Sequence, residues 1–361
     1  MSNILFILKR REDYNAVMHS NIGLSTGLFN SASFVNDLLS RTGFTSNLVV
    51  VTDNNDIDRE VTKYKPTHVI IEALWVVPTK FAVLQKLHPN VKWIIRLHSE
   101  MPFMAGEGMA MDWIGDYSTF KNVVIACNAP RMLNEVRLFL RVKNNWTDEQ
   151  TNNKVVYLPN YYPQFYRDAR PYDYKKQTVD VGCFGAIRLL KNHLVQAFAA
   201  IDFANRIGKK LRFHINAGRI EMKGEPALHN LKGLFQHLHD QGHELINHNW
   251  TPREQFIDLC SQMDIGLQVS FSETFNIVSA DYISQGVPVV GSNEIPWLTS
   301  DWFYQTSYCA NPTDSKDIAD KMVLAYKNPK SNVKQGQKSL RQYTNKTESI
   351  WRKYFDNHEN P

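Results

Sequence analysis

Short apolar runs alternate with segments of helical periodicity along most of this chain, and the alternation occurs twice. In the first half, apolar runs of strand length occupy residues 3–8, 46–52, 68–74, 92–98, 122–127 and 154–162. Between several of them, apolar residues recur at helical spacing over residues 28–43, 78–88 and 129–142. This alternation is typical of a parallel sheet with helices on both faces.

The alternation stops and then restarts. Residues 164–178 are rich in Tyr, Pro and Asp without any period, which is typical of a linker. Beyond them, predicted strands at 179–187, 210–218, 244–250, 264–270 and 286–292 alternate with predicted helices at 191–206, 226–241, 252–262 and 276–285. A chain of 361 residues also exceeds the usual size of a single core. The sequence therefore predicts two α/β domains, 1–163 and 179–340, and a C-terminal helix at 341–361 that packs back on the first domain.

Composition excludes several classes of protein. The chain is 43% hydrophobic and 21% charged, as in an ordinary soluble protein. The apolar run at 4–8 is too short for a signal peptide, and no stretch is long enough to cross a membrane. The four cysteines lie far apart without CxxC spacing, which argues against a disulfide framework. We therefore expect a cytoplasmic protein, whose net charge of +5 permits a polyanionic partner.

Two acidic residues, Glu273 and Asp281, bracket a mostly apolar segment. Glu273 follows the predicted strand 264–270, at the edge where parallel sheets bind ligands, and a predicted helix begins just after it. Asp281 lies about two helical turns further, near the same face. Carboxylates so placed can accept hydrogen bonds from the vicinal hydroxyls of a sugar or ribose. Spacing alone leaves open the alternative of a helix-capping acid and a solvated aspartate.

The whole segment SFSETFNIVSADYISQGVPVVGS, residues 270–292, resembles the donor-site signature of the group 1 retaining glycosyltransferases. VVYLPN at 155–160 and FGAIRLLKN at 184–192 are similar to further segments of that family. The resemblance implies the GT-B fold, with two Rossmann-like parallel-sheet domains and a cleft between them. It also implies a donor bound mainly by the second domain.

The resemblance implies roles for individual residues. Glu273 would hold hydroxyls of the donor sugar, and Asp281, where the family usually has Glu, the ribose. Arg188 and Lys191 would neutralise the diphosphate leaving group, and Arg188 is inferred because Ala186 stands where the family usually has arginine. His98 would lie under the anomeric carbon.

The expected residues form two sets. The catalytic set is Glu273, His98, Arg188 and Lys191, and the donor-binding set is Gly27, Gly185, Thr274, Phe275, Asn276 and Asp281. No cofactor is required, since the nucleotide sugar, expected to be a UDP-sugar, is a substrate.

The acceptor is expected on the first domain, at two predicted loops, 9–25 and 98–117. The residues expected to bind it are Lys9, Arg10, Arg11 and Trp113. Positive charge beside aromatic surface suits a phosphate-bearing polymer. The Asn-, Tyr- and Lys-rich sequence also resembles bacteriophage proteins, which favours hydroxymethylcytosine in double-stranded phage DNA, modified with glucose or arabinose. The cluster 137–143 would then help to hold phosphates.

Two alternatives remain open for function. One is a glycosyltransferase of lipopolysaccharide or surface polysaccharide synthesis, and the other is a nucleotide- or nucleic-acid-binding module without catalysis. For metals, Asp56 and Asp58 have the spacing of a divalent-cation site, while His239 and His243 are four residues apart on a predicted helix. Neither pair has enough ligands, and no metal site is expected.

Overall fold

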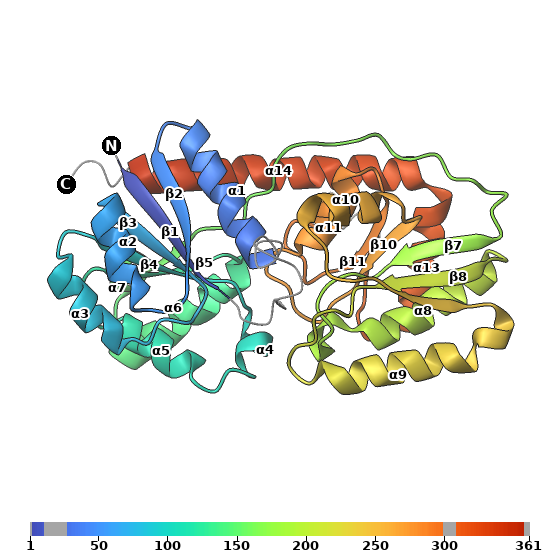
Figure 1. The fold of residues 1–361 in the computed structure, drawn as a ribbon, viewed down its shortest axis with the longest axis horizontal. Helices are drawn as coiled ribbons and strands as arrows, with labels where there is room; N and C mark the ends of the chain where they lie inside the picture. Colours follow the sequence, from blue (N-terminus) through green and yellow to red (C-terminus); the bar gives the residue numbers. More distant parts are fainter. Residues whose placement is uncertain (1, 11–26, 299–307, 357–361) are drawn as a thin grey trace. The chain divides into compact units, whose positions relative to one another are not determined.

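A computed structural model describes residues 2–10, 27–298 and 308–356 (Figure 1). The chain divides into two compact units: Met1–Pro163 together with Thr344–Pro361, and Gln164–Tyr343. Each unit contains a six-stranded sheet in which every described strand pair is parallel. The predicted α/β class with two parallel sheets is confirmed.

The first sheet has the strand order β2-β1-β3-β4-β5-β6. Its strands are β1 (Asn3–Lys9), β2 (Thr45–Val51), β3 (His68–Glu72), β4 (Lys92–Leu97), β5 (Val123–Cys127) and β6 (Val155–Tyr157). The chain moves from β1 to β2 on one side and then crosses to β3 on the other. Strand order therefore reverses between β1 and β3, the point at which parallel sheets usually bind ligands.

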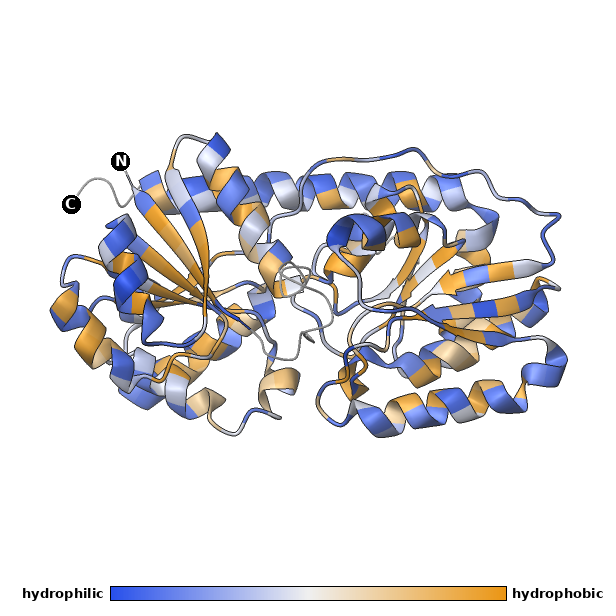
Figure 2. Ribbon diagram, in the orientation of Figure 1, coloured by the Kyte–Doolittle hydropathy of each residue, from blue (hydrophilic) through white to orange (hydrophobic). Residues whose placement is uncertain are grey.

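Helices bury both faces of the first sheet. On one face, Leu5 and Ile7 pack with residues of α2 (Asp56–Tyr64), α3 (Thr79–Leu87), α5 (Ala110–Tyr117) and α6 (Pro130–Asn144). On the other face, Ile4 and Phe6 pack with α1 (Gly27–Arg41) and with the last turns of α14 (Pro329–Asp356). Because both faces of the central strands are buried, these strands are mainly apolar, as the orange colour in Figure 2 shows.

The second sheet has the order β12-β11-β10-β7-β8-β9. Its strands are β7 (Thr178–Gly182), β8 (Lys210–Ile215), β9 (Glu244–Asn247), β10 (Ile265–Gln268), β11 (Val289–Ser292) and β12 (Cys309–Ala310). Its helices are α8 (His193–Arg206), α9 (Gly224–His237), α10 (Arg253–Ser261), α11 (Ile277–Ser284) and α13 (Ser315–Lys327). The chain runs β7, β8, β9 and then returns to β10, so strand order reverses between β7 and β10.

Helix α11 lies directly on the two strands that flank this reversal. A Cβ atom at Gly182 would come within 2.2 Å of the Tyr282 hydroxyl, and one at Gly266 within 2.3 Å of the Tyr282 ring. Glycine in both strands therefore provides the space that the buried tyrosine fills. This close approach fixes the height of α11 above the sheet.

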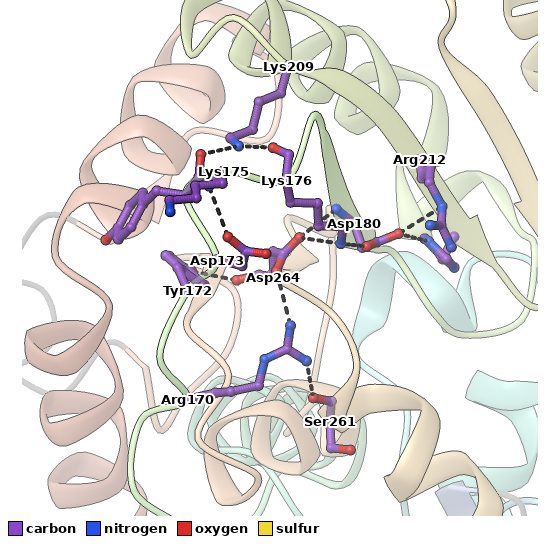
Figure 3. Close-up of polar contacts among 12 residues, drawn as sticks. Arg170, Tyr172, Asp173, Lys175, Lys176, Asp180, Lys209, Arg212, Ser261 and Asp264 are labelled. Carbon is purple, nitrogen blue, oxygen red and sulfur yellow. Dashed lines mark hydrogen bonds and ion pairs between the residues drawn. The ribbon is translucent and has the colours of Figure 1, made fainter.

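The predicted linker, 164–178, contains no helix or strand before β7 begins at Thr178, but side chains hold it to the second sheet (Figure 3). Arg170 donates to the Ser261 carbonyl at 2.9 Å and to Asp264 at 3.2 Å. The Tyr172 hydroxyl donates to the Asp264 carbonyl at 2.5 Å. The segment is thus fixed to the second unit by polar contacts.

Several predicted boundaries were wrong. The predicted loop 98–117 contains α4 (Met101–Met104) and α5, and helices α2, α7 (Asp148–Lys154) and α13 were missed. The C-terminal helix begins at Pro329, well before 341. The predicted strands 210–218 and 244–250 end at Ile215 and Asn247, because the residues that follow form loops at the edge of the sheet. Within the described residues, no helix has the length and apolar character needed to cross a membrane.

Candidate functional site

The loops that follow β7 and β10 meet where strand order reverses in the second sheet. After β7 the chain turns at Gly185, whose φ of +128° favours glycine and whose N–H donates to Asn216 Oδ1 at 2.7 Å. It then forms the short helix η2 (Leu189–Lys191). This path carries Lys191 back toward the loop after β10.

Lys191 and Glu273 form an ion pair at this point. Lys191 Nζ lies 2.5 Å from Glu273 Oε1, and the two side chains are only 12% and 7% exposed. Asn276 Nδ2 donates to the same carboxylate oxygen at 3.1 Å. Burial acts to raise the pKa of Glu273, but the charges of Lys191 and Arg188 outweigh it and hold the pKa below its ordinary value. Glu273 is therefore an ionised acceptor at neutral pH.

Polar side chains that were not predicted join the two loops. Gln196 of α8 donates to the Lys191 carbonyl at 2.7 Å and accepts from the Val269 N–H at 2.6 Å. Asn192, just before α8, donates to the Val269 carbonyl at 3.0 Å. The Phe271 N–H donates to the Leu190 carbonyl at 2.9 Å. The ion pair therefore rests on a hydrogen-bonded frame.

Asn276, predicted to contribute a backbone amide, is the N-cap of α11. It has a left-handed backbone, with φ of 61°, and its Oδ1 accepts from the Ser279 N–H at 2.9 Å. The alternative in which Glu273 caps this helix is wrong, because that role belongs to Asn276. Of the two residues between them, Thr274 is partly buried, whereas Phe275 is buried and its carbonyl accepts from Trp297 Nε1 at 2.8 Å.

Asp281 is fully buried and paired with Arg253, the first residue of α10. Arg253 donates to both carboxylate oxygens, at 2.6 Å to Oδ1 and 3.3 Å to Oδ2. The alternative of a solvated aspartate is therefore wrong. Arg253 itself was not predicted, and its position after a Pro at the start of a helix gave no sign of this partner.

Arg188 lies next to the ion pair and is itself paired with a carboxylate. Arg188 is 3.4 Å from Glu221, and Glu221 also pairs with Arg219. His193, the first residue of α8, is buried, and burial together with the charges of Lys191 and Arg188 lowers its pKa to about 3. A neutral histidine thus lies beside two cations, although no sequence feature singled it out.

The first unit has a carboxylate of its own at the end of β3. Glu72 and Arg96 are register neighbours in β3 and β4, both fully buried, with Arg96 donating to Glu72 at 3.0 Å. The predicted residue His98 also contacts Glu72 through Nε2, and Asn128 lies 3.2 Å from its other ring nitrogen. Burial first, and then the charge of Arg96, lower the pKa of His98, while Glu72 opposes them. The structure thus brings His98 to a buried ionic cluster that was not predicted.

The remaining predicted residues of the first unit are dispersed. Lys9 ends β1 and Arg10 follows it, both exposed, whereas Arg11 and most of the predicted loop 9–25 are outside the described residues. Gly27 is the exposed first residue of α1. Trp113 of α5 is half-buried and packs against the core of the first unit.

Two basic residues of the cluster 137–143, Arg137 and Arg141, already make contacts within the first unit. Arg137 donates to the Val155 carbonyl at 2.9 and 3.1 Å, and Arg141 pairs with Asp148 at 2.8 Å.

The suggested metal ligands have other partners. Asp56 accepts from the Thr52 N–H at 3.0 Å, and Asp58 lies 2.7 Å from His88. His239 is exposed, whereas His243 is buried and accepts from the Leu211 N–H at 3.0 Å. In residues 2–10, 27–298 and 308–356, no three His, Cys, Asp or Glu side chains are grouped so as to hold a metal ion.

No protein-family model matches this sequence, and no curated protein has a sequence that matches it. Similar solved structures include a UDP-forming α,α-trehalose-phosphate synthase from Burkholderia xenovorans in complex with glucose-6-phosphate, at 12% identity and a TM-score of 0.67, covering 98% of this chain and 99% of that one. The corresponding enzyme from Burkholderia vietnamiensis is 10% identical with a TM-score of 0.69, covering 99% and 98%.

A sucrose-phosphate synthase from Thermosynechococcus elongatus is 14% identical with a TM-score of 0.65, covering 99% of this chain and 100% of that one. Because identity is this low, these likenesses establish the fold alone. The chain has the GT-B fold that the resemblance implied, with two parallel-sheet units.

Proposed function

We propose that this protein is a glycosyltransferase that moves a sugar from a UDP-sugar to a hydroxyl acceptor. The observation that supports this most is the Lys191–Glu273 pair, a partly buried cation and a buried, ionised carboxylate at the point of strand reversal in the second sheet. The GT-B fold, shared with solved sugar-phosphate synthases, supports the same reaction class.

Each member of the pair suits a different part of the donor, the diphosphate or the sugar. Lys191, with Arg188 nearby, supplies fixed positive charge for the diphosphate, whose negative charge grows as it leaves. Glu273 accepts hydrogen bonds from hydroxyls of the transferred sugar. In the reaction, the bond between the anomeric carbon and the diphosphate oxygen breaks while the acceptor oxygen bonds to that carbon. The acceptor attacks from the face that the diphosphate leaves, and its proton passes to the leaving phosphate, so configuration is retained without a protein nucleophile.

Asp281 is proposed to contact the ribose of the donor. Because Arg253 already donates to both of its oxygens, a ribose hydroxyl would use a remaining lone pair of the same carboxylate. The UDP assignment is supported by the neighbours described as UDP-forming.

For the acceptor, we propose a hydroxyl compound that carries phosphate. Lys9 and Arg10 provide exposed positive charge after β1, beside the point of strand reversal in the first sheet. A sugar phosphate is favoured, since one neighbour was solved with glucose-6-phosphate. Hydroxymethylcytosine in DNA, the acceptor predicted from the sequence, forms the second arm of the test, and lipopolysaccharide core forms the third.

The experiment measures UDP release and glycosylated product with UDP-glucose and other UDP-sugars, each with glucose-6-phosphate, hydroxymethylated duplex DNA or lipopolysaccharide core. Transfer to one acceptor is expected. Glu273→Gln should lower turnover by about 100-fold or more, whereas Glu244→Gln, at an exposed position of β9, should leave it unchanged.

Two results would contradict the proposal. If UDP binds but no acceptor is modified, and Glu273→Gln changes nothing, the chain is a binding module. If no nucleotide stabilises the protein against heat, the second unit does not hold a nucleotide. Should DNA be the acceptor, Arg10→Ala must also flatten the salt dependence of DNA binding.

A further inference from the structure

The first turns of α14 carry a row of positive charges on one face. Its members are separated by four, four and three residues, a spacing that places them on the same side of a helix: Lys330, Lys334, Lys338 and Arg341. All four residues are exposed, and all belong to the second unit, which ends at Tyr343. We call these four residues the basic stripe.

The segment that precedes β7 adds a fifth cation beside the basic stripe. Gln337 of α14 donates through Nε2 to the Arg167 carbonyl at 2.7 Å, and the Arg341 guanidinium lies 5.0 Å from the centre of the Tyr166 ring. Arg167 is exposed. The exposed Asp168 follows it but forms no ion pair with any residue that the structure describes, so the surface keeps its positive charge.

The charges of the neighbouring helix α13 are balanced, whereas those of the basic stripe are not. In α13, two lysines each pair with an aspartate four residues away, at 3.0 and 3.8 Å: Lys316 with Asp320, and Lys321 with Asp317. In the basic stripe, Lys330, Lys334 and Arg341 form no ion pair within the described ranges. The stripe is therefore a surface of one sign.

This arrangement opposes the stability of the helix. Like charges four residues apart on a helix repel one another, and the basic stripe contains two such pairs, Lys330 with Lys334 and Lys334 with Lys338. Lys330 also lies in the first turn, where the helix dipole favours acidic side chains, and α14 has no acidic residue there. An anionic partner would remove this repulsion.

Nucleic acid fits the basic stripe better than a membrane or a protein does. Helices that lie on membranes combine positive charge with a large apolar face. Among its described residues, α14 exposes no large apolar side chain, and Ser331 and Gln342 lie among its exposed cations (Figure 2). Phe165 is exposed in the adjoining segment, but isolated apolar residues are common on protein surfaces. Protein interfaces are depleted in lysine, whereas nucleic-acid backbones are neutralised by Lys and Arg.

The length of the basic stripe also suits a phosphate backbone. Lys330 and Arg341 are about 16 Å apart along the helix axis, at about 1.5 Å per residue. Each strand of duplex DNA carries one phosphate per about 3.4 Å of its axis, so the stripe spans about five phosphates of one strand.

We propose that the basic stripe, together with Arg167, binds the phosphate backbone of nucleic acid without regard to base sequence. This surface lies outside the Lys191–Glu273 site, so the inference goes beyond the proposed function and does not rest on it. The binding holds nucleic acid against α14 whichever acceptor is glycosylated.

The test measures the affinity for a fluorescent 20-base-pair DNA duplex by anisotropy at several salt concentrations, without any nucleotide sugar. The stripe variant replaces all four cations by glutamine: Lys330→Gln, Lys334→Gln, Lys338→Gln and Arg341→Gln. Its plot of log affinity against log salt should be less steep than that of the wild type by about 3, since each phosphate contact contributes about 0.9 to the slope. The variant with only Lys330→Gln and Lys334→Gln should lose about half as much.

A matched control removes four positive charges at exposed positions elsewhere: Lys86→Gln, Lys121→Gln, Lys175→Gln and Lys232→Gln. The control and the stripe variant have the same net charge, so a difference between them reports the place of the charges. The control should keep a slope within about 1 of the wild-type value. The stripe variant should unfold at a temperature no lower than the wild type, because repulsion within α14 has been removed.

Four results would overturn the inference. The wild type does not bind the duplex, or the stripe variant keeps the wild-type slope, or the control loses as much slope as the stripe variant does. The fourth is binding of the wild type to vesicles of phosphatidylserine and phosphatidylcholine but not to DNA, which would make the partner a membrane. A loss of thermal stability in the stripe variant would likewise show that its cations stabilise the fold. None of these results bears on UDP binding at Lys191, so the transferase proposal is tested separately.

Discussion

Each of the two sheets carries a buried carboxylate beside its point of strand reversal, but the two carboxylates are held differently. Glu72 pairs with Arg96 at 0% exposure of both side chains, and Arg96 also donates to the Leu158 and Pro159 carbonyls. Glu273 pairs with Lys191 at slightly higher exposure, and among the described residues Lys191 Nζ makes a single hydrogen bond, to Glu273.

The difference distinguishes a structural ion pair from one able to bind a ligand. The guanidinium of Arg96 is surrounded by acceptors from its own unit, so no ligand is needed to satisfy it. The ammonium of Lys191 has three N–H donors, and the further donors can turn to an incoming phosphate. The number of hydrogen-bond acceptors around the cation therefore distinguishes the two sites better than burial does.

The largest effect is expected on the free energy of unfolding, when the Glu72–Arg96 pair is broken. Glu72→Gln leaves the Arg96 charge buried without its counter-charge, which should lower the free energy of unfolding by about 3–5 kcal/mol. Urea denaturation followed by circular dichroism measures this loss. If Glu273→Gln is as destabilising as Glu72→Gln, the distinction between the two sites is lost.

The next largest effect is expected on the affinity for UDP, when the Lys191–Glu273 pair is changed. Lys191→Met removes the cation nearest the predicted diphosphate and should weaken UDP binding by about 10- to 100-fold, since hydrogen bonds to charged groups contribute about 1.5–3 kcal/mol. Calorimetric titration with UDP measures the change. Lys209→Met, whose ammonium contacts the Tyr174 and Lys176 carbonyls, is the control and should leave affinity intact. Unchanged affinity in Lys191→Met would remove this residue from the donor site.

The stability of the protein at low pH should show that both carboxylates are ionised in the folded state. The pKa of Glu72 and of Glu273 is held below the ordinary 4.5, in each case by neighbouring cations acting against burial. Their contribution to stability is therefore complete above pH 4.5 and is lost as the pH falls through the lower, folded-state pKa. Glu273→Gln should lose less unfolding free energy than the wild type over that interval. Parallel acid titrations of stability measure the difference, and identical curves would show that Glu273 is not ionised in the folded protein.

The smallest effects are expected at two left-handed residues that follow strands at the reversal points. Ala73 after β3 has φ of 69°, and Gly185 after β7 has φ of 128°. Ala73→Gly relieves backbone strain and should raise the unfolding free energy by less than about 1 kcal/mol, whereas Gly185→Ala should lower it by about 1–2 kcal/mol. Thermal unfolding of both variants checks the opposite signs. The same sign in both would mean that local backbone conformation does not distinguish these turns.

The sequence was sufficient to predict the strands of both sheets except the two-residue edge strand β12, because strands buried on both faces are continuous apolar runs between turn residues. It also singled out Glu273, which directly follows such a run, whereas Lys191 was singled out only through the resemblance of FGAIRLLKN to the glycosyltransferase family. It was not sufficient for residues whose partners are distant in the sequence. Gln196, Arg253 and His214 have unremarkable local patterns, and only the folded chain brings them to Lys191, Asp281 and Asp180.

Helices with a weakly periodic or highly polar sequence were missed for a different reason. In α7 the sequence DEQTNNK has no apolar face, and its start is fixed by Thr147 and Gln150, whose side chains cap one another's backbone N–H groups. Most of α14 is likewise polar, with a few apolar residues such as Leu340 and Trp351 widely spaced along it. Hydrophobic spacing alone underestimates such helices.

The close packing of Tyr282 against Gly182 and Gly266 limits how the sequence of this protein can diverge. A methyl group at either glycine becomes acceptable only after the ring above has been replaced by something smaller, so the three positions are not free to mutate in arbitrary order. Among homologues, alanine at 182 or 266 should occur together with a reduced side chain at 282. Such co-variation would trace an evolutionary path on which the tyrosine was lost first.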